Sequence, residues 1–255
     1  MKARILHKNI IQQLIAAKQS NRKLFVVLID PDKAEAGDLQ DIITKAEAAA
    51  VDLFFVGGSL MVSDSMDRCL ETIRSKSHIP SVLFPGNPIQ LSEKADALLY
   101  LSLISGRNAE LLIGNHVVTA PLLMRSCVEV MPTGYMLIDG GAPTTVSYIS
   151  NTFPIPANKP EIAMATAMAG QLLGLKLIYM DAGSGAQNPV PAKMIAKVRE
   201  AIELPIIVGG GIRTPEQAAK AAAAGADMIV VGNQLEENAE LVFEMARAVH
   251  SLNYA

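Results

Sequence analysis

The amino-acid sequence predicts a single α/β domain over residues 1–255, folded as a (β/α)8 barrel, or TIM barrel. Eight short apolar, β-rich runs recur along the chain, and helical or loop segments separate them. The runs do not alternate between apolar and polar residues, which is typical of parallel strands buried on both faces. The length of 255 residues also fits one barrel, and no linker divides the chain. We expect strands at residues 24–29, 53–56, 82–84, 98–101, 135–138, 177–180, 206–208 and 228–231.

The first element that we expect is a helix before the first strand. Ile10, Ile11, Leu14 and Ile15 follow helical spacing, and polar residues interrupt them. The segment therefore predicts an amphipathic surface helix and not a signal peptide. No apolar stretch reaches the roughly 20 residues that span a bilayer. We expect a cytoplasmic protein that makes only transient contact with a membrane surface if its substrate is a lipid.

Two later connections differ from the regular strand–helix pattern. Residues 85–88, after the third strand, are Pro-Gly-Asn-Pro and leave too little chain for a helix, so a reduced crossover is expected there. Residues 151–160, after the fifth strand, contain three prolines and form a candidate lid. Regular helices are expected at residues 191–201, 215–224 and 236–250. Thr214 is a suitable N-cap for the second of them, with Pro215 at the first helical position.

Composition excludes several classes of protein. The formal net charge is −3 and no basic run occurs, so nucleic acid is not an expected partner. Cys69 and Cys127 form no paired motif, and the four histidines are scattered, so neither a disulfide framework nor a zinc site is predicted. A reducing cytoplasm fits this cysteine usage.

Glycines gather where the last three strands end. In a (β/α)8 barrel these carboxyl ends open onto the active site, and phosphate commonly binds beside the loops after strands seven and eight. Glycine lets backbone amides approach an anion closely, and a following helix N-terminus favours negative charge. The sequence therefore predicts a phosphate site at strands six to eight, although any one cluster alone could serve only as a tight turn. The clusters are residues 183–185, 209–211 and 232.

An acidic segment and a hydroxyl follow the first two strands. Asp30 begins an Asp-Pro-Asp-Lys segment, and Ser59 follows two glycines. A carboxylate with a nearby hydroxyl suits Mg²⁺, which takes few protein oxygens and completes its shell with water and phosphate oxygens. The alternative is that Asp30 or Asp32 caps a helix or forms a turn beside Pro31. The spacing does not decide between the two.

Together these segments resemble the geranylgeranylglyceryl phosphate synthases and their bacterial relatives, over nearly the whole chain. The motifs that carry the resemblance are IDPDK at 29–33, VGGS at 56–59, FPGN at 84–87, YMDAGSGA at 179–186, VGGGI at 208–212 and GN at 232–233. The resemblance implies a Mg²⁺-dependent prenyltransferase. It would join the C3 hydroxyl of sn-glycerol 1-phosphate to a geranylgeranyl or similar prenyl diphosphate, giving an ether-lipid precursor. A homo-oligomer is also implied.

The same resemblance implies roles for particular residues. Asp30 and Ser59 would hold Mg²⁺. The family usually has glutamate where this chain has Asp181, which would still orient or deprotonate the glycerol hydroxyl. Lys33 is a candidate to stabilise the departing diphosphate. The glycerol phosphate site would be lined by Tyr179, Met180, Asp181, Ala182, Gly183, Ser184, Gly185, Gly210, Gly211, Gly232 and Asn233.

A prenyl chain also needs an apolar trough, for which the candidate walls are residues 85–91 and 98–103. Two other classes of function stay open. Strands seven and eight alone would suit a phosphosugar isomerase, a lyase or an FMN enzyme. A non-catalytic barrel that binds a phosphorylated metabolite is the third class, because Asp181 departs from the family pattern.

Overall fold

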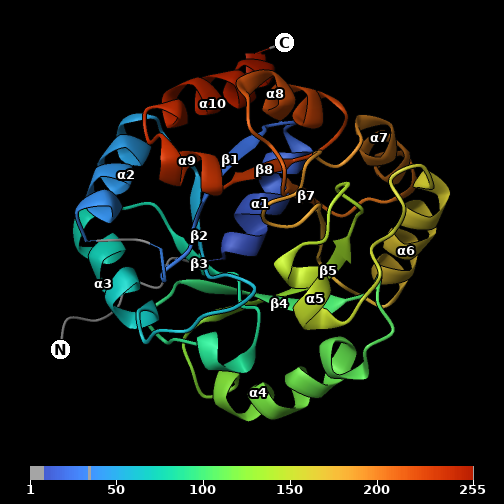
Figure 1. The fold of residues 1–255 in the computed structure, drawn as a ribbon, viewed down its shortest axis with the longest axis horizontal. Coiled ribbons are helices and arrows are strands. Elements are labelled where there is room, and N and C mark those ends of the chain that lie inside the picture. Colours follow the sequence, from blue (N-terminus) through green and yellow to red (C-terminus); the bar gives the residue numbers. More distant parts are fainter. Residues whose placement is uncertain (1–8, 34–35, 255) are drawn as a thin grey trace.

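The computed structural model describes residues 9–33 and 36–254, and it forms a closed barrel of eight parallel strands in the order β1 to β8. Helices surround the barrel (Figure 1), so the predicted (β/α)8 fold is confirmed. The strands are β1 Leu24–Ile29, β2 Leu53–Val56, β3 Ser81–Leu83, β4 Ala97–Leu103, β5 Glu129–Leu137, β6 Leu177–Asp181, β7 Ile206–Gly209 and β8 Met228–Val231.

The helical elements follow the strands around the barrel wall. The α-helices are α1 Ile10–Gln19, α2 Ala36–Ala48, α3 Met66–Lys76, α4 Asn115–Leu123, α5 Thr145–Ser150, α6 Pro160–Leu172, α7 Ala192–Ala201, α8 Pro215–Ala223, α9 Asn233–Glu237 and α10 Leu241–His250. Three short helical turns complete the set: η1 Pro88–Gln90, η2 Glu110–Gly114 and η3 Ser251–Tyr254. Only η1 lies between β3 and β4, which confirms the reduced crossover.

Strand side chains form two buried layers because successive residues point to opposite faces. One layer fills the barrel interior and includes Val26, Phe55 and Tyr179. The other packs between the barrel and its helices and includes Val27 and Phe54. Most strands are therefore apolar throughout, which is why the sequence shows runs without alternation.

Helix α1 is amphipathic as expected, but it does not lie on the outer surface. Ile10 and Leu14 are 1% and 3% exposed and pack into the interior layer below the strands. The Glu129 carboxylate at the start of β5 accepts hydrogen bonds from the Ile10 and Ile11 amides, at 2.6 and 3.0 Å. The helix therefore closes the amino-terminal end of the barrel, where Figure 1 shows it behind the strands.

Glu129→Ala is expected to lower the free energy of unfolding by about 1–3 kcal/mol, because it leaves two amides of α1 without their charged acceptor. Chemical denaturation measures this. The matched control is Glu203→Ala, since Glu203 also pairs with α1, through Lys18, but its side chain is 91% exposed. The control is expected to cost under about 0.5 kcal/mol. Equal losses for the two variants would contradict the role given to Glu129.

Two elements differ from the sequence-based expectation by more than a residue or two at an end. β5 begins at Glu129, six residues before the predicted start, because Pro132, Gly134 and a charged first residue hide a strand that pairs with β4 over its length. The helix expected at 236–250 is two helices, α9 and α10. Asn238 interrupts it, and its side chain accepts a hydrogen bond from the Glu240 amide, an alternative to helical bonding.

The proline-rich segment predicted as a lid is attached to the barrel at its middle. Ile155 is 4% exposed and forms a parallel bridge with Ile138, the residue after β5. Thr214 does cap α8, as expected, by accepting a hydrogen bond from the Gln217 amide. Among the described residues, no helix is both long and apolar enough to cross a membrane.

Candidate active site

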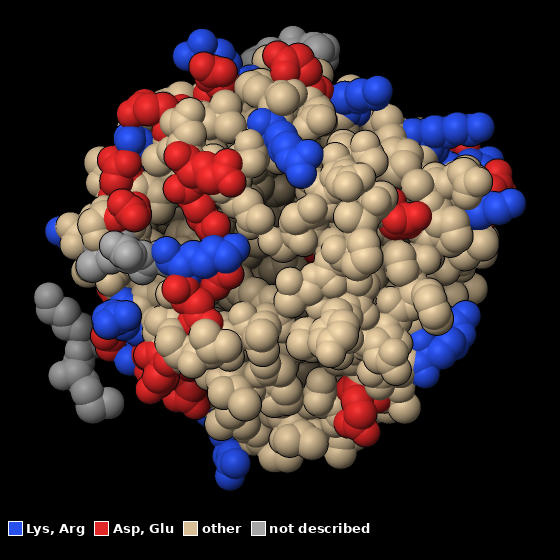
Figure 2. Space-filling view, viewed as in Figure 1, with Lys and Arg blue, Asp and Glu red and all other residues tan. Residues whose placement is uncertain are grey.

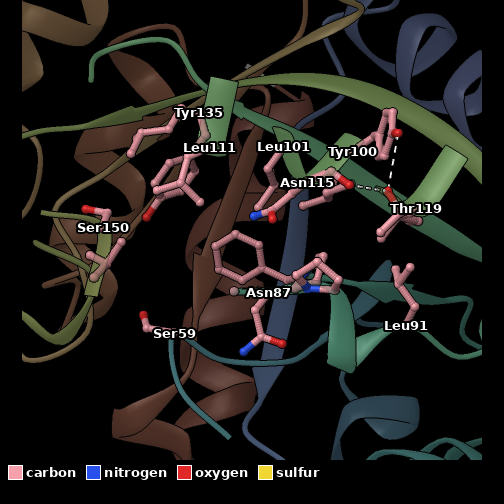
Figure 3. Close-up of a pocket in the computed structure, with 18 of the residues that line it drawn as sticks. Ser59, Asn87, Leu91, Tyr100, Leu101, Leu111, Asn115, Thr119, Tyr135 and Ser150 are labelled. Carbon is pink, nitrogen blue, oxygen red and sulfur yellow. Dashed lines mark hydrogen bonds between the residues drawn. The ribbon is translucent and has the colours of Figure 1, made fainter. Parts of the chain in front are cut away.

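Two cavities lie at the carboxyl ends of the strands. The polar cavity, of about 520 Å³, lies between the ends of β1, β2 and β6 to β8. The apolar cavity, of about 140 Å³, lies between β3, β4, η1, α4 and α5 (Figure 3). Gly58, Ser59 and Phe84 line both cavities, so the two are adjacent and share a wall.

The polar cavity collects most of the residues predicted for the site. Those that line it are Asp30, Lys33, Ser59, Tyr179, Asp181, Ser184, Gly185, Gly210, Gly211, Gly232 and Asn233. Met180 and Ala182 do not, because their side chains point outward into the layer beneath the helices. The strand period of two makes Tyr179 and Asp181 neighbours on the cavity side. Gly183 is not a lining residue, and its amide binds Asp181.

The Asp181 carboxylate is buried at the end of β6 and has one donor on each oxygen. The Tyr135 hydroxyl donates to Oδ2 at 2.6 Å, and the Gly183 amide donates to Oδ1 at 2.7 Å. Burial raises the pKa of the Asp181 carboxyl, while the hydrogen bonds from Tyr135 and Gly183 oppose this shift. The arrangement gives a fixed carboxylate with an increased affinity for a proton.

An aromatic group separates the two cavities. Phe84 stacks on Tyr179 with ring centroids 5.0 Å apart, and Tyr135 meets Tyr179 edge-on at 5.5 Å. Burial raises the pKa of both tyrosine hydroxyls well above 10, with the Asp181 charge adding to the effect. Both hydroxyls therefore stay protonated and can only donate or accept hydrogen bonds at neutral pH.

The glycine loops present free backbone amides at the polar cavity. Gly210 and Gly211 have φ of 76° and 69°, which an L side chain rarely adopts. Within the described part of the chain, the amides of Ser184, Gly185, Gly210 and Gly211 have no hydrogen-bond acceptor. A phosphate would supply acceptors for such unsatisfied donors. The Asn233 amide group also donates to the Ser184 hydroxyl, at 3.0 Å, and joins the β6 and β8 loops.

The opposite wall of the polar cavity is charged. The Lys33 ammonium lies 3.5 Å from both the Asp30 and the Glu236 carboxylates, and burial raises the pKa of Glu236. Asp30 also accepts a hydrogen bond from the Asp32 amide, so it forms the turn that the sequence left open and still faces the cavity. The Asp32 carboxylate binds Val62, Ser63 and Ser65 and so holds the neighbouring loop.

The carboxylate and hydroxyl on this wall fit a magnesium ion. The Ser59 hydroxyl makes no hydrogen bond to any described residue, and the Asp30 carboxylate is 20% exposed at the cavity. Hard oxygen donors with room for further ligands are what Mg²⁺ requires. Lys33 balances part of the negative charge of the carboxylates on this wall.

The apolar cavity has the walls expected for a trough. Residues 85–88 and 91 line it from the β3 side, and 98–101 and 103 line it from β4. Helix α5, and not the proline-rich segment, contributes Val146, Ile149 and Ser150, and α4 contributes Asn115, His116 and Thr119. Tyr100 and Thr119 lie at the end remote from Ser59 (Figure 3), and the Tyr100 hydroxyl donates to the His116 carbonyl at 2.8 Å.

Sequence reasoning missed several residues of the site. Tyr135 was predicted only as a strand residue and Phe84 only as a strand end within the FPGN motif, without a role in the site, yet both separate the cavities. Glu236 was expected inside a long helix, but the break before α10 places it at the cavity wall on α9. Gln90 is buried and binds the Gly58 carbonyl and the Gly86 amide. A polar residue in the short β3–β4 crossover was the available signal for Gln90.

The fold and the site define the class of protein: a (β/α)8 barrel in which a cavity with free backbone amides lies beside an apolar cavity. Residues 17–250 match the model of the PcrB family. The geranylgeranylglyceryl phosphate synthase of Chitinophaga pinensis is 55% identical over 246 residues, covering 96% of this chain and 98% of the relative. The enzyme of the same name from Thermococcus gammatolerans is 42% identical, covering 89% and 90%. The chain therefore belongs to the PcrB family.

Solved structures agree with this assignment. The (S)-3-O-geranylgeranylglyceryl phosphate synthase of Thermoplasma acidophilum, in complex with its substrate sn-glycerol-1-phosphate, superposes with a TM-score of 0.90. It is 32% identical, and the match covers 95% of this chain and 98% of that one. A tryptophan synthase structure from Mycobacterium tuberculosis is only 15% identical, with a TM-score of 0.59, and shares the fold alone. The family resemblance drawn from the motifs is confirmed.

Proposed function

We propose that this chain transfers a prenyl group from its diphosphate to the C3 hydroxyl of sn-glycerol 1-phosphate. The observation that carries the proposal is the adjacency of two unlike cavities, one lined by free amides and one by apolar side chains. A phosphorylated acceptor fits the first and a prenyl tail fits the second. A phosphosugar isomerase or an FMN enzyme gives no reason for the apolar cavity.

The residues of the site suit each part of the transfer. The acceptor oxygen forms a bond to C1 of the prenyl group while the C1–O bond to diphosphate breaks and its electron pair leaves with the diphosphate. Asp181 takes the hydroxyl proton, as a general base whose raised pKa suits this task. The amides of the glycine loops hold the acceptor phosphate and so orient its C3 hydroxyl.

The diphosphate end of the donor would lie at the charged wall. Asp30 and Ser59 would hold Mg²⁺, which supplies positive charge to the leaving group when bound. Lys33 lies on the same wall and stabilises negative charge there. Ser59 lines both cavities, so this end of the donor would lie where the apolar cavity begins.

The test is a radiolabel transfer assay with sn-glycerol 1-phosphate and prenyl diphosphates of C15 to C35. Product is expected with Mg²⁺ and not with EDTA, and the 3-phosphate enantiomer is expected to react poorly. Product from no donor, with folding confirmed by circular dichroism, would reject the prenyltransferase. Binding of glycerol phosphate without product would favour the non-catalytic barrel.

Thr119→Trp is expected to shorten the preferred donor, because Thr119 is 7% exposed and lines the end of the apolar cavity remote from Ser59. Competition between donors of graded length measures the preference. An indole at this end fills space that the last isoprene units would occupy, so selectivity against the longest donor is expected to rise about 10–100-fold. Val117→Trp on the 66% exposed face of the same helix is the control. An unchanged preference in Thr119→Trp would place the tail elsewhere.

A homo-oligomer and a brief contact with a membrane surface belong to the same proposal. Charged side chains are sparse over α4 and α5 in Figure 2. Exposed apolar residues on or directly after α4, α5 and α6 support self-association, which sedimentation velocity tests; they include Val117, Val118, Met124, Tyr148, Leu172 and Leu173.

A further inference from the structure

The hydrogen bond between Tyr135 and Asp181 joins a residue of each cavity. Tyr135 lines the apolar cavity and Asp181 lines the polar cavity, and neither lines both. We propose that Tyr135 is a positioning residue for the transfer: its hydroxyl holds the Asp181 carboxylate where it accepts the proton of the acceptor hydroxyl. The inference rests on the proposed function and adds a role that the glycine and metal motifs do not contain.

Strand register produces this contact. β5 and β6 pair in parallel with Tyr135 opposite Tyr179 and Leu137 opposite Asp181. Tyr135 is therefore two residues before Leu137, the residue opposite Asp181, and its side chain points to the same inner face. The phenol ring is long enough for its hydroxyl to reach the carboxylate. The aspartate side chain is short, so a partner on the neighbouring strand reaches it without displacing it from the strand end.

The packing around the ring fixes the hydroxyl. Tyr135 is 6% exposed, and its ring packs against both Phe84 and Tyr179, with ring centroids 6.0 and 5.5 Å away. Together with the Gly183 amide, the phenol gives each carboxylate oxygen one donor. Each oxygen keeps a further lone pair for the substrate hydroxyl. The carboxylate is therefore held in one orientation before the acceptor binds.

The charges around Asp181 are few, so the hydrogen bond has a predictable effect on its protonation. Among the described residues, the titratable side chains next to it are Tyr135 from β5 and Tyr179 from β6, while β7 offers glycines at this level. The charged Asp30, Lys33 and Glu236 line the opposite wall of the cavity. Burial raises the pKa of Asp181, and the Tyr135 hydrogen bond lowers it. Loss of the hydroxyl therefore raises the pKa of Asp181 further. Because a general base acts when ionised, activity would then appear only at higher pH.

The experiment compares Tyr135→Phe, Asp181→Asn and the double variant in the transfer assay from pH 5 to 9. Tyr135→Phe keeps the ring packing and is expected to lower kcat about tenfold. The acid limb of its pH profile, the range where kcat falls as pH is lowered, is expected to move to higher pH. The affinity for sn-glycerol 1-phosphate, measured by calorimetry, and the donor KM are expected to change less than about threefold. In the Asp181→Asn background the same substitution is expected to add less than about twofold, because the two residues act as one unit.

Tyr100→Phe is the matched control, since it also removes a hydrogen-bonded tyrosine hydroxyl from the apolar cavity, one that is half-buried and binds a backbone carbonyl. Its acid limb is expected to stay in place. The inference would be overturned if the acid limb of Tyr135→Phe stayed in place. It would also be overturned if the kcat losses of Tyr135→Phe and Asp181→Asn multiplied in the double variant, because either result would show a structural role only. A wild-type protein that makes no product would instead overturn the proposed function.

Discussion

Replacing Asp181 by asparagine is expected to lower kcat for prenyl transfer by about 10²–10⁴-fold, the usual contribution of a general base. Asparagine has the same shape, and its oxygen can still accept a hydrogen bond from Tyr135 or Gly183. It cannot take a proton from the acceptor hydroxyl. The acceptor phosphate is held by the glycine loops, so the affinity for sn-glycerol 1-phosphate is expected to stay within about threefold.

Rate and affinity are measured separately, by single-turnover transfer and by calorimetry. Asp139→Asn is the matched control, because Asp139 is exposed just after β5 and its carboxylate accepts a hydrogen bond from the Gly141 amide, its one partner among the described residues. Retention of more than a tenth of kcat in Asp181→Asn would show that the carboxylate only orients the hydroxyl. The acid limb of the wild-type protein is expected above the usual pKa of aspartate, because burial raises the pKa of Asp181.

Gly210→Ala is expected to weaken binding of sn-glycerol 1-phosphate by about 100-fold or more. Gly210 has a φ of 76°, and a Cβ there would lie 2.4 Å from Asp181 Oδ1 and 2.5 Å from the Gly183 amide nitrogen. Both groups belong to the site, so relief of the clash displaces the base and the anion-binding loop together. Transfer is expected to fall at least as much as binding.

The control for Gly210 separates backbone strain from the clash. Gly174, after α6, has a φ of 85°, a Cβ added to it would have no atom within 4 Å, and it lies outside both cavities. Gly174→Ala is expected to cost about 1 kcal/mol of stability and to leave acceptor binding unchanged. Equal binding by the two variants would contradict the anion site at the β7 loop.

Much of this site follows from the sequence because of one property of parallel barrels. The carboxyl ends of all strands meet at one edge, so residues that end different runs, such as Asp30, Ser59, Asp181 and Gly210, come together without knowledge of contacts. Unbroken apolar runs locate the strands because both faces of each strand are buried in this fold. The prediction of element boundaries failed at three residues. Strand β5 continues through Pro132 and Gly134, and helix α9 ends just before Asn238.

The sequence did not predict which side chains contact each other across neighbouring strands. The pairing of Tyr135 with Asp181 depends on the register of β5 against β6, and the start of β5 was misplaced by six residues. Met180 points outward because successive strand residues face opposite sides of the sheet. It was predicted as a site residue because it lies within the YMDAGSGA motif. The ion pair of Lys33 with Glu236 joins the β1 loop to α9, and the two residues are 203 positions apart.

A crystal structure of the chain with sn-glycerol 1-phosphate, Mg²⁺ and a non-hydrolysable geranylgeranyl thiodiphosphate would test the proposed transfer at the level of atoms. We expect the acceptor phosphate on the Gly210 and Gly185 amides, its C3 hydroxyl on Asp181, and the tail between β4 and α4. Phosphate at the Asp30 wall with the C3 hydroxyl away from Asp181, or a tail outside the apolar cavity, would contradict the proposed transfer.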